Sequence, residues 1–279
     1  MTQKLIAPLL LTLAMILLAT SCFSPEQPDT VSAVPENLAG SHSGKIDFEA
    51  FQNVEIDVMS PSIIFEPGDT FSAEYTLHNR EKLSRAEVKD STLYFFTEFD
   101  PNWKIDWDNW QLRITIPADT ELGNINISTV AGDIIISGYE LKNALMSTTS
   151  GKVQLQDMTA DSLYLKNVSG NISISESHVE TINSKSISGS VSLGGDFGEA
   201  ELKSTSGNCI LRGTITKEAS LDTVSGHITA DVPAPSVSAQ SFGRVLLNGR
   251  KQGGTFDIEN GEPSLRAKSV SGNIDIQTK

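Results

Sequence analysis

The sequence predicts an all-β fold, a single-stranded β-solenoid (β-helix-like) of roughly 19-residue coils with an irregular N-terminal β cap. Two observations favour it. A short Ser-Gly turn recurs along residues 119–279, and apolar and polar residues alternate on both sides of each turn. No segment after the N-terminus repeats with a helical period, so strands must provide the regular structure.

The turn glycines set the length of each coil. They are Gly132, Gly151, Gly170, Gly189, Gly207, Gly226 and Gly272, with spacings of 19, 19, 19, 18, 19 and 46. A degenerate copy at Phe242, Gly243 and Arg244 divides the last interval into 17 and 29. We expect each glycine to mark a sharp corner or a backbone conformation that other residues disfavour, with Asn171, Asn208 and Asn273 contributing to the turns.

Apolar side chains stand two and four residues after each glycine. The pairs include Ile134 and Ile136, Val153 and Leu155, Ile172 and Ile174, Val191 and Leu193, and Ile274 and Ile276. A single coil cannot bury such a face, so consecutive copies are expected to stack with these residues in columns. Cys209 occupies a column position that is Ile or Val in most other copies, which favours a buried, inert thiol.

The repeated turns also support a resemblance to a known family. Ser-Gly-Asn-Ile and Ala-Gly-Asp-Ile turns, preceded by the segments 114–119 and 122–127, resemble the bacterial putative adhesin family, a group of β-repeat envelope proteins of unknown function. The resemblance covers roughly residues 50 to 279. It implies adhesion without identifying a ligand, and it carries over no catalytic residues.

The N-terminus indicates export. Lys4 is followed by an apolar run from Leu5 to Ala19, which is too short for a comfortable membrane span, and then by small residues before Cys22. Residues 18–22 resemble a lipobox, with Ala19 where Leu is usual, which implies lipidation of Cys22, for example with palmitate. The alternative is an ordinary signal peptide that is cleaved near Cys22.

These features predict the domain organisation. Residues 1–21 are expected to be the lipoprotein signal peptide, 22–44 a polar tether, 45–118 an N-terminal β cap or irregular first coils, and 119–279 the solenoid repeats. The formal net charge of −14 argues against sequence-independent nucleic-acid binding, which requires Lys and Arg at phosphates. With Cys22 acylated, Cys209 would have no disulfide partner within the chain.

Three tryptophans lie in one short segment. Trp103, Trp107 and Trp110 stand beside carboxylates, an arrangement that suits a sugar-binding platform. The alternative, which we favour, is a β-hairpin whose indole rings pack within the N-terminal cap.

A row of lysines precedes the turns. Lys166, Lys185, Lys203 and Lys268 each stand four residues before a glycine, with Asp222 interrupting the row. Stacked coils would place them about 4.8 Å apart, where a column of like charges could attract an anionic polymer. A solvated charged face is the alternative.

Residues 249–263 form the largest break in the array. They include Asp257, Glu259 and Glu262, and paired carboxylates can hydrolyse glycosides when suitably separated. A surface loop is the simpler interpretation. The histidines His42, His78, His178 and His227 are scattered, so we expect no metal and no cofactor.

The preferred interpretation is a non-catalytic, lipid-anchored cell-envelope protein that presents a β-solenoid surface as an adhesin or for contacts within the envelope. We expect it at the outer membrane if the host is Gram-negative, either periplasmic or surface-exposed, with a glycan or protein of the envelope or host as partner. The alternatives are a polysaccharide-binding or polysaccharide-degrading β-helix protein, and a structural or stress-response envelope component without an external ligand. The sequence leaves the oligomeric state open.

Overall fold

The computed structural model describes residues 40–101 and 109–278. The signal peptide, Cys22 and most of the tether lie outside the described residues, as do Trp103 and Trp107. The described residues form a β-solenoid, which confirms the predicted fold class, and no helix occurs among them.

The strands in the described residues are β1 (Ser43–Asp47), β2 (Asn53–Val58), β3 (Ser62–Gly68), β4 (Ser72–Thr76), β5 (Glu81–Lys89), β6 (Thr92–Phe99), β7 (Gln111–Pro117), β8 (Leu122–Thr129), β9 (Ile134–Ser137), β10 (Glu140–Thr148), β11 (Val153–Gln156), β12 (Thr159–Asn167), β13 (Ile172–Ser186), β14 (Val191–Ser204), β15 (Cys209–Thr223), β16 (Ile228–Asp231), β17 (Ser236–Ser241), β18 (Val245–Leu247), β19 (Arg250–Lys251), β20 (Thr255–Ile258), β21 (Ser264–Ser269) and β22 (Ile274–Gln277).

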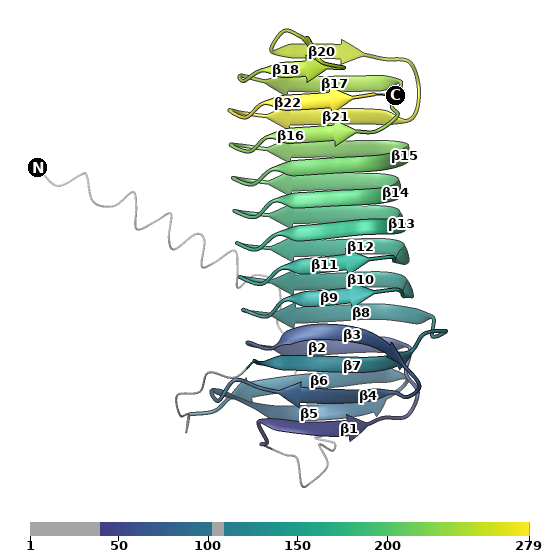
Figure 1. The fold of residues 1–279 in the computed structure, drawn as a ribbon, viewed down its shortest axis with the longest axis vertical. Coiled ribbons are helices and arrows are strands. Elements are labelled where there is room, and N and C mark those ends of the chain that lie inside the picture. Colours follow the sequence, from purple (N-terminus) through teal and green to yellow (C-terminus); the bar gives the residue numbers. More distant parts are fainter. Residues whose placement is uncertain (1–39, 102–108, 279) are drawn as a thin grey trace, which may run out of the picture. The chain divides into compact units, whose positions relative to one another are not determined.

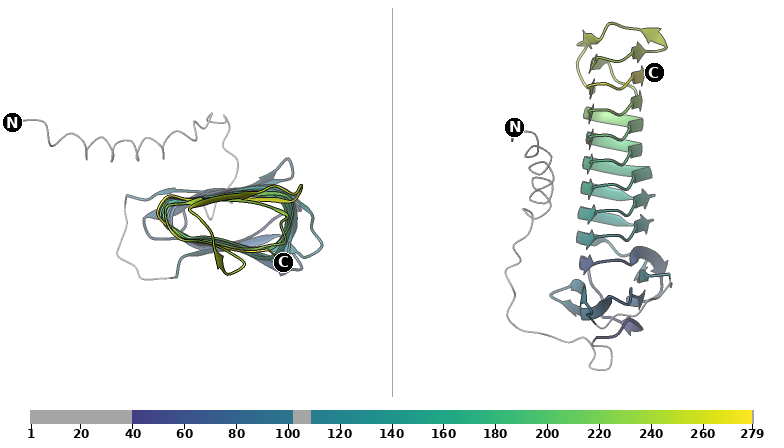
Figure 2. Two further views of the ribbon diagram at one scale, coloured as in Figure 1. Left: turned by 90° about the horizontal axis from the view of Figure 1, so that it is seen from above. Right: turned by 90° about the vertical axis from the view of Figure 1, so that its left-hand side faces the viewer.

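The strands form two facing rows (Figure 1). One row, whose outer surface we call face A, runs β5, β6, β2, β8, β10, β12, the second halves of β13 to β15, β21, β17 and β20. The opposite row, with face B outside, runs β1, β4, β7, β3, β9, β11, the first halves of β13 to β15, β16, β22, β18 and β19. Viewed along the stack, the coils superpose as a flattened ring (Figure 2).

The core fills the narrow space between the rows. The alternating residues predicted to face inward are buried, including Ile134, Val153, Ile172 and Val191. Cys209 is fully buried in the same column, next to Val191 and Ile228, which confirms its prediction as a core residue. Burial raises the pKa of its thiol to about 12.

The glycines of the Ser-Gly corner are required by close packing. None of them has a positive φ, so the proposed need for an unusual backbone conformation is wrong at this corner. Each lies instead against the previous coil: a Cβ on Gly151, Gly170 or Gly189 would lie 1.7 to 1.8 Å from the carbonyl oxygen of the corner glycine before it. Only a residue without a side chain permits this approach.

Buried polar side chains hold the same corner together. The residue three positions before each glycine is Thr, Ser or Asn, and its side chain accepts a hydrogen bond from the glycine N–H, as Thr148 does from Gly151 at 3.0 Å. The Thr148 hydroxyl also donates to the Gly132 carbonyl of the neighbouring coil, at 3.2 Å. After the glycine, Asn171 and Asn208 accept from the backbone of the next coil, at Ser190 and His227. The corner sequence is therefore a structural device.

Positive φ values occur at the opposite corner. They recur in five successive coils, at Gly138, Asp157, Glu176, Gly195 and Gly213. Two of the five are not glycine, with φ values of 52° at Asp157 and 53° at Glu176, and for this reason the sequence shows no repeated motif there.

Stacking departs from chain order at both ends, which corrects the expectation that consecutive copies stack. The last coil, β21 and β22, lies between β15–β16 and β17–β18. Thus Gly272 packs on Gly226, and Gly243 packs on Gly272. The degenerate turn around Gly243 occupies the outer position, where no further coil has to pack on its corner. Similarly, β2 and β3 lie between β6–β7 and β8–β9.

Candidate functional site

Face A presents two columns of outward side chains. The lysine column consists of Ser128, Ser147, Lys166, Lys185, Lys203, Asp222 and Lys268. The tyrosine column, two residues earlier on the same strands, consists of Asn126, Leu145, Tyr164, Asn183, Glu201, Ser220 and Arg266. Both columns follow from the two-residue period of a strand, which turns these residues outward while Leu163 and Leu165 face the core.

The lysines differ in their neighbours. Lys203 forms an ion pair with Glu201, whose other oxygen accepts a hydrogen bond from Asn183. The hydrogen bond from Lys203 lowers the pKa of the Glu201 carboxyl, and in turn Glu201 raises the pKa of Lys203. Lys203 is therefore already neutralised by the protein.

Lys166 and Lys185 form a different environment. They are adjacent in the register of β12 and β13, and neither takes part in an ion pair among the described residues. The Lys185 Nζ lies 5.5 Å from the ring centroid of Tyr164. Tyr164 and Leu145, its neighbour one coil earlier, are 36% and 41% exposed. Two ammonium groups therefore lie beside the exposed apolar surface of Leu145 and Tyr164.

Of the three tryptophans only Trp110 lies within the described residues, and the structure does not bring it to this surface. Trp110 precedes β7 in the face B row, and its carbonyl accepts a hydrogen bond from Ser62 N. Its indole packs edge-on against His78, with ring centroids 4.1 Å apart. The Trp110 Nε1 is buried without a hydrogen-bond partner. Trp110 therefore lies in the cap, and its proposed role in sugar binding remains a prediction.

The late segment contains two short strands. β19 carries Arg250 and Lys251, and Asp257 on β20 pairs in register with Ser238. Asp257, Glu259 and Glu262 are all exposed. None of these three carboxylates lines either of the hollows described below.

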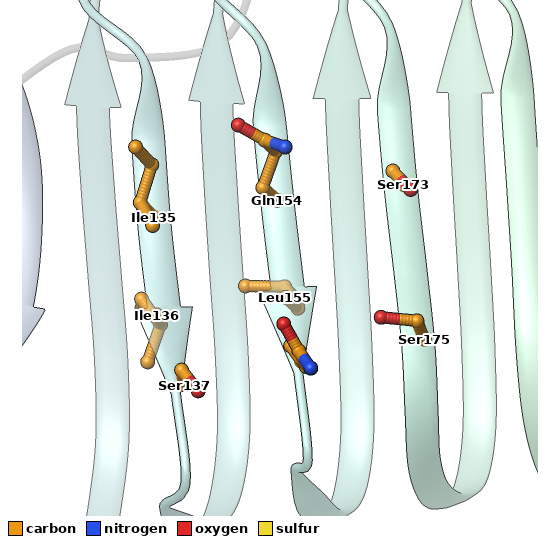
Figure 3. A pocket seen from close by; sticks show the side chains of 8 residues that line it. Ile135, Ile136, Ser137, Gln154, Leu155, Ser173 and Ser175 are labelled. Atoms are coloured by element: carbon orange, nitrogen blue, oxygen red, sulfur yellow. The ribbon is translucent and has the colours of Figure 1, made fainter.

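The first hollow lies on face B (Figure 3) and measures about 140 Å³. Figure 3 shows its side chains on three strands, with Gln154 on β11 between Ile135 on β9 and Ser173 on β13. A second, mainly apolar hollow of about 540 Å³ lies at Ile215, Pro233, Ala234, Pro235 and Pro263. Neither hollow is lined by an acidic, basic or histidine side chain, so neither offers acid–base chemistry.

The histidines have separate positions. His42 Nδ1 lies 2.8 Å from the Glu81 carbonyl, and His227 Nδ1 accepts a hydrogen bond from Asn273 N at 3.0 Å. His227 thereby continues the row of side chains that Asn171 and Asn208 form along the turns. Among residues 40–101 and 109–278, no three His, Cys, Asp or Glu side chains converge as metal ligands.

Sequence reasoning identified the lysine column but missed its apolar neighbours. Leu145 and Tyr164 lie two residues before Ser147 and Lys166, so the same alternation that located the lysines could have located them. In the part of the chain that the structure describes, no helix is long and apolar enough to span a bilayer.

Comparison with known proteins identifies the family. The Toastrack DUF4097 family model matches residues 51–277, so the chain belongs to this family of β-repeat proteins. No curated protein matches the chain significantly.

Solved structures share the fold. The chain is similar to a putative adhesin from Parabacteroides distasonis ATCC 8503, with 15% identity, a TM-score of 0.52, and 85% of this chain and 96% of that chain covered. It is also similar to a putative adhesin from Parabacteroides merdae ATCC 43184, with 16% identity, a TM-score of 0.51, and coverage of 85% and 95%. At these identities the likeness concerns the fold alone.

Proposed function

We propose that this chain is a non-catalytic lipoprotein of the cell envelope, held on a membrane by acyl chains on Cys22, and that its outer β-faces bind another molecule of the envelope or of a host surface. The main support for the proposal is face A, which presents continuous columns of outward-facing, half-exposed to exposed side chains on consecutive coils. Similar folds called putative adhesins in Parabacteroides species agree with this role.

The layout of the chain favours display over catalysis. Tight corners join most coils, and the outward column of face B that consists of Ile135, Gln154, Ser173, Ser192, Ile210 and Thr229 carries no charged side chain. Such a surface suits recognition of an extended partner across several coils, since equivalent positions repeat at the strand spacing of about 4.8 Å.

The anchor can be tested directly. We expect the full-length protein to incorporate labelled palmitate and to enter the detergent phase on phase separation, because two or more acyl chains give stable membrane association. Cys22→Ser should abolish both behaviours, while Cys209→Ser, the matched control, should change neither. Unlabelled wild-type protein in the aqueous phase would refute the anchor.

Display can be tested on intact cells. Protease shaving should remove the protein if the solenoid faces outside, and cells producing it should adhere to glycan or matrix surfaces better than cells lacking it. Protection from the protease together with unchanged adhesion would refute the adhesin function and favour contacts inside the envelope.

A further inference from the structure

We infer that Lys166, Lys185 and Tyr164 form a binding site for an acidic glycan on face A. This inference rests on the proposed recognition function and deepens it by naming a ligand class. The site, which we call the Tyr-Lys platform, consists of Leu145, Ser147, Tyr164, Lys166, Asn183 and Lys185.

The platform carries two adjacent positive charges. Lys166 and Lys185 lie on neighbouring strands, about 4.8 Å apart along the stack, and no carboxylate stands among the six residues. The nearest acid of the tyrosine column, Glu201, is ion-paired with Lys203 and hydrogen-bonded to Asn183, and it attracts Lys185 only at longer range. Two adjacent cations repel each other, and an anionic ligand bridging them would relieve that repulsion.

The tyrosine column adds an exposed apolar surface beside the lysines. Tyr164 and Leu145 are both more than a third exposed and lie side by side on consecutive coils. An exposed apolar surface of this kind can pack against the apolar face of a sugar ring, while a carboxylate on the ring reaches the lysines. The Lys185 ammonium, 5.5 Å from the Tyr164 ring, connects the two parts of the platform.

The coils on either side of the platform limit the path of a bound ligand. On the side toward β8 the same columns carry Ser128 and Asn126, which are small and neutral. An acidic glycan running along the stack can therefore extend over β8 but not further, because Glu55 and Asp57 of β2 stand next to Asn126 and Ser128 in the two columns. Toward β15, the lysine column continues from Lys203 to Asp222. The Asp222 carboxylate repels an anionic ligand, so such a ligand does not extend past this position.

The columns supply conservative substitutions for the test. Lys166→Ser and Lys185→Ser introduce the residue that the column already has at Ser147, and Tyr164→Asn introduces the residue found at Asn183. The matched control is Lys152→Ser with Lys251→Ser, which removes the same charge from exposed positions on other strands and turns than those of the platform. Circular dichroism and thermal unfolding should show that all variants remain folded.

The measurement is binding of the full-length protein to polygalacturonate, with dextran as a neutral glycan and poly-glutamate as an anion without sugar rings. We expect polygalacturonate to bind and the other two to bind at least about tenfold more weakly. Lys166→Ser with Lys185→Ser should weaken binding about tenfold or more, and Tyr164→Asn about threefold or more, in line with typical charge and ring contributions. The control variant should stay within about twofold of wild type.

Several results would overturn the inference: equal binding of poly-glutamate, an unchanged Tyr164→Asn variant, an equal loss in the control, or tighter binding to vesicles of anionic lipid through the same lysines. Absence of polygalacturonate binding would also overturn it. These failures leave the proposed function standing, because palmitate labelling and adhesion of intact cells are measured without this ligand.

Discussion

The carboxylate of Glu81 accepts hydrogen bonds from the backbone N–H groups of Met59 and Ser60, with Oε1 to Met59 N at 2.6 Å and Oε2 to Ser60 N at 3.1 Å. Glu81 is completely buried, and Thr97 also donates to it. Met59 and Ser60 form the corner on which Gly132 packs, since the Met59 carbonyl accepts from Ala131 N and a Cβ on Gly132 would meet the Pro61 carbonyl oxygen. In the regular coils, the corner N–H groups donate hydrogen bonds to backbone carbonyl groups of the neighbouring coil. At Met59 and Ser60 the Glu81 carboxylate takes the place of those carbonyl groups.

Removing this cap should destabilise the fold. Glu81→Ala would leave the Met59 and Ser60 N–H groups without acceptors, and we expect the free energy of unfolding to fall by about 2 to 4 kcal/mol, the usual cost of losing a buried charged acceptor. The measurement is the urea midpoint followed by circular dichroism. Glu98→Ala, which removes an exposed carboxylate paired with Lys82, is the control and should change the midpoint little. Equal effects of the two variants would contradict the capping role.

The corner glycines give a second prediction. Gly170→Ala would place a Cβ 1.8 Å from the Gly151 carbonyl oxygen, a contact that only movement of the backbone can relieve. We expect a loss of about 3 kcal/mol or more, or failure to fold. Gly194→Ala is the matched control, because its nearest neighbour would be the Ile174 oxygen at 3.6 Å. A Gly170→Ala protein as stable as Gly194→Ala would contradict the close packing of the corners.

The buried hydroxyls give a third prediction. Thr148→Val keeps the shape of the side chain but removes the acceptor for Gly151 N–H and the donor to the Gly132 carbonyl, so we expect a loss of about 1 to 3 kcal/mol. Thr149→Val, one residue later, lies on the exposed side of the corner where Val130 and Val168 stand in other coils. It should be nearly neutral in the same denaturation assay. If the two variants unfold together, the hydroxyl network contributes nothing.

Much of the regular fold could be predicted from the sequence because one spacing governs it. Period-two alternation around the Ser-Gly turn identified the inward columns, including Cys209, and the interval of 18 or 19 residues brought Lys166, Lys185 and Lys203 into one column. Where successive coils pack in the same way, they carry similar residues at equivalent positions, and the structure can be predicted from that repetition.

The rest could not be predicted, for physical reasons that differ by site. The inserted coils depend on which strand edges meet across long connections, and local alternation carries no information about that choice. The opposite corner is set by backbone angles that Asp157 and Glu176 adopt without a recognisable motif. The role of Glu81 arises from contacts with Met59 and Ser60, more than twenty residues away in the sequence.

The inserted last coil can be tested by cross-linking. Asp222 and Lys268 face outward on neighbouring strands, whereas stacking in chain order would place Asp222 beside Gln240. We expect Asp222→Cys with Lys268→Cys to form a disulfide under mild oxidation, because adjacent strands bring Cα atoms within disulfide range. Asp222→Cys with Gln240→Cys, two strands apart, should not. Disulfide formation is measured by gel mobility and located by peptide mapping. Faster oxidation of the second pair than of the first would contradict the observed order of the strands.

The raised thiol pKa gives the last prediction. Because Cys209 is buried and its pKa is about 12, the thiolate is scarce at neutral pH and a maleimide should not label it in the folded protein. Unfolding in urea should expose one reactive thiol if Cys22 is acylated. The pKa of the thiol is higher in the folded protein than its ordinary value of 9.0, so this contribution to stability is complete below pH 9 and is lost as the pH rises toward 12. Cys209→Val, which matches Val191 in the same column, should show a smaller alkaline loss of stability. Labelling of Cys209 in the folded state would contradict its burial, and labelling of Cys22 would contradict the lipid anchor.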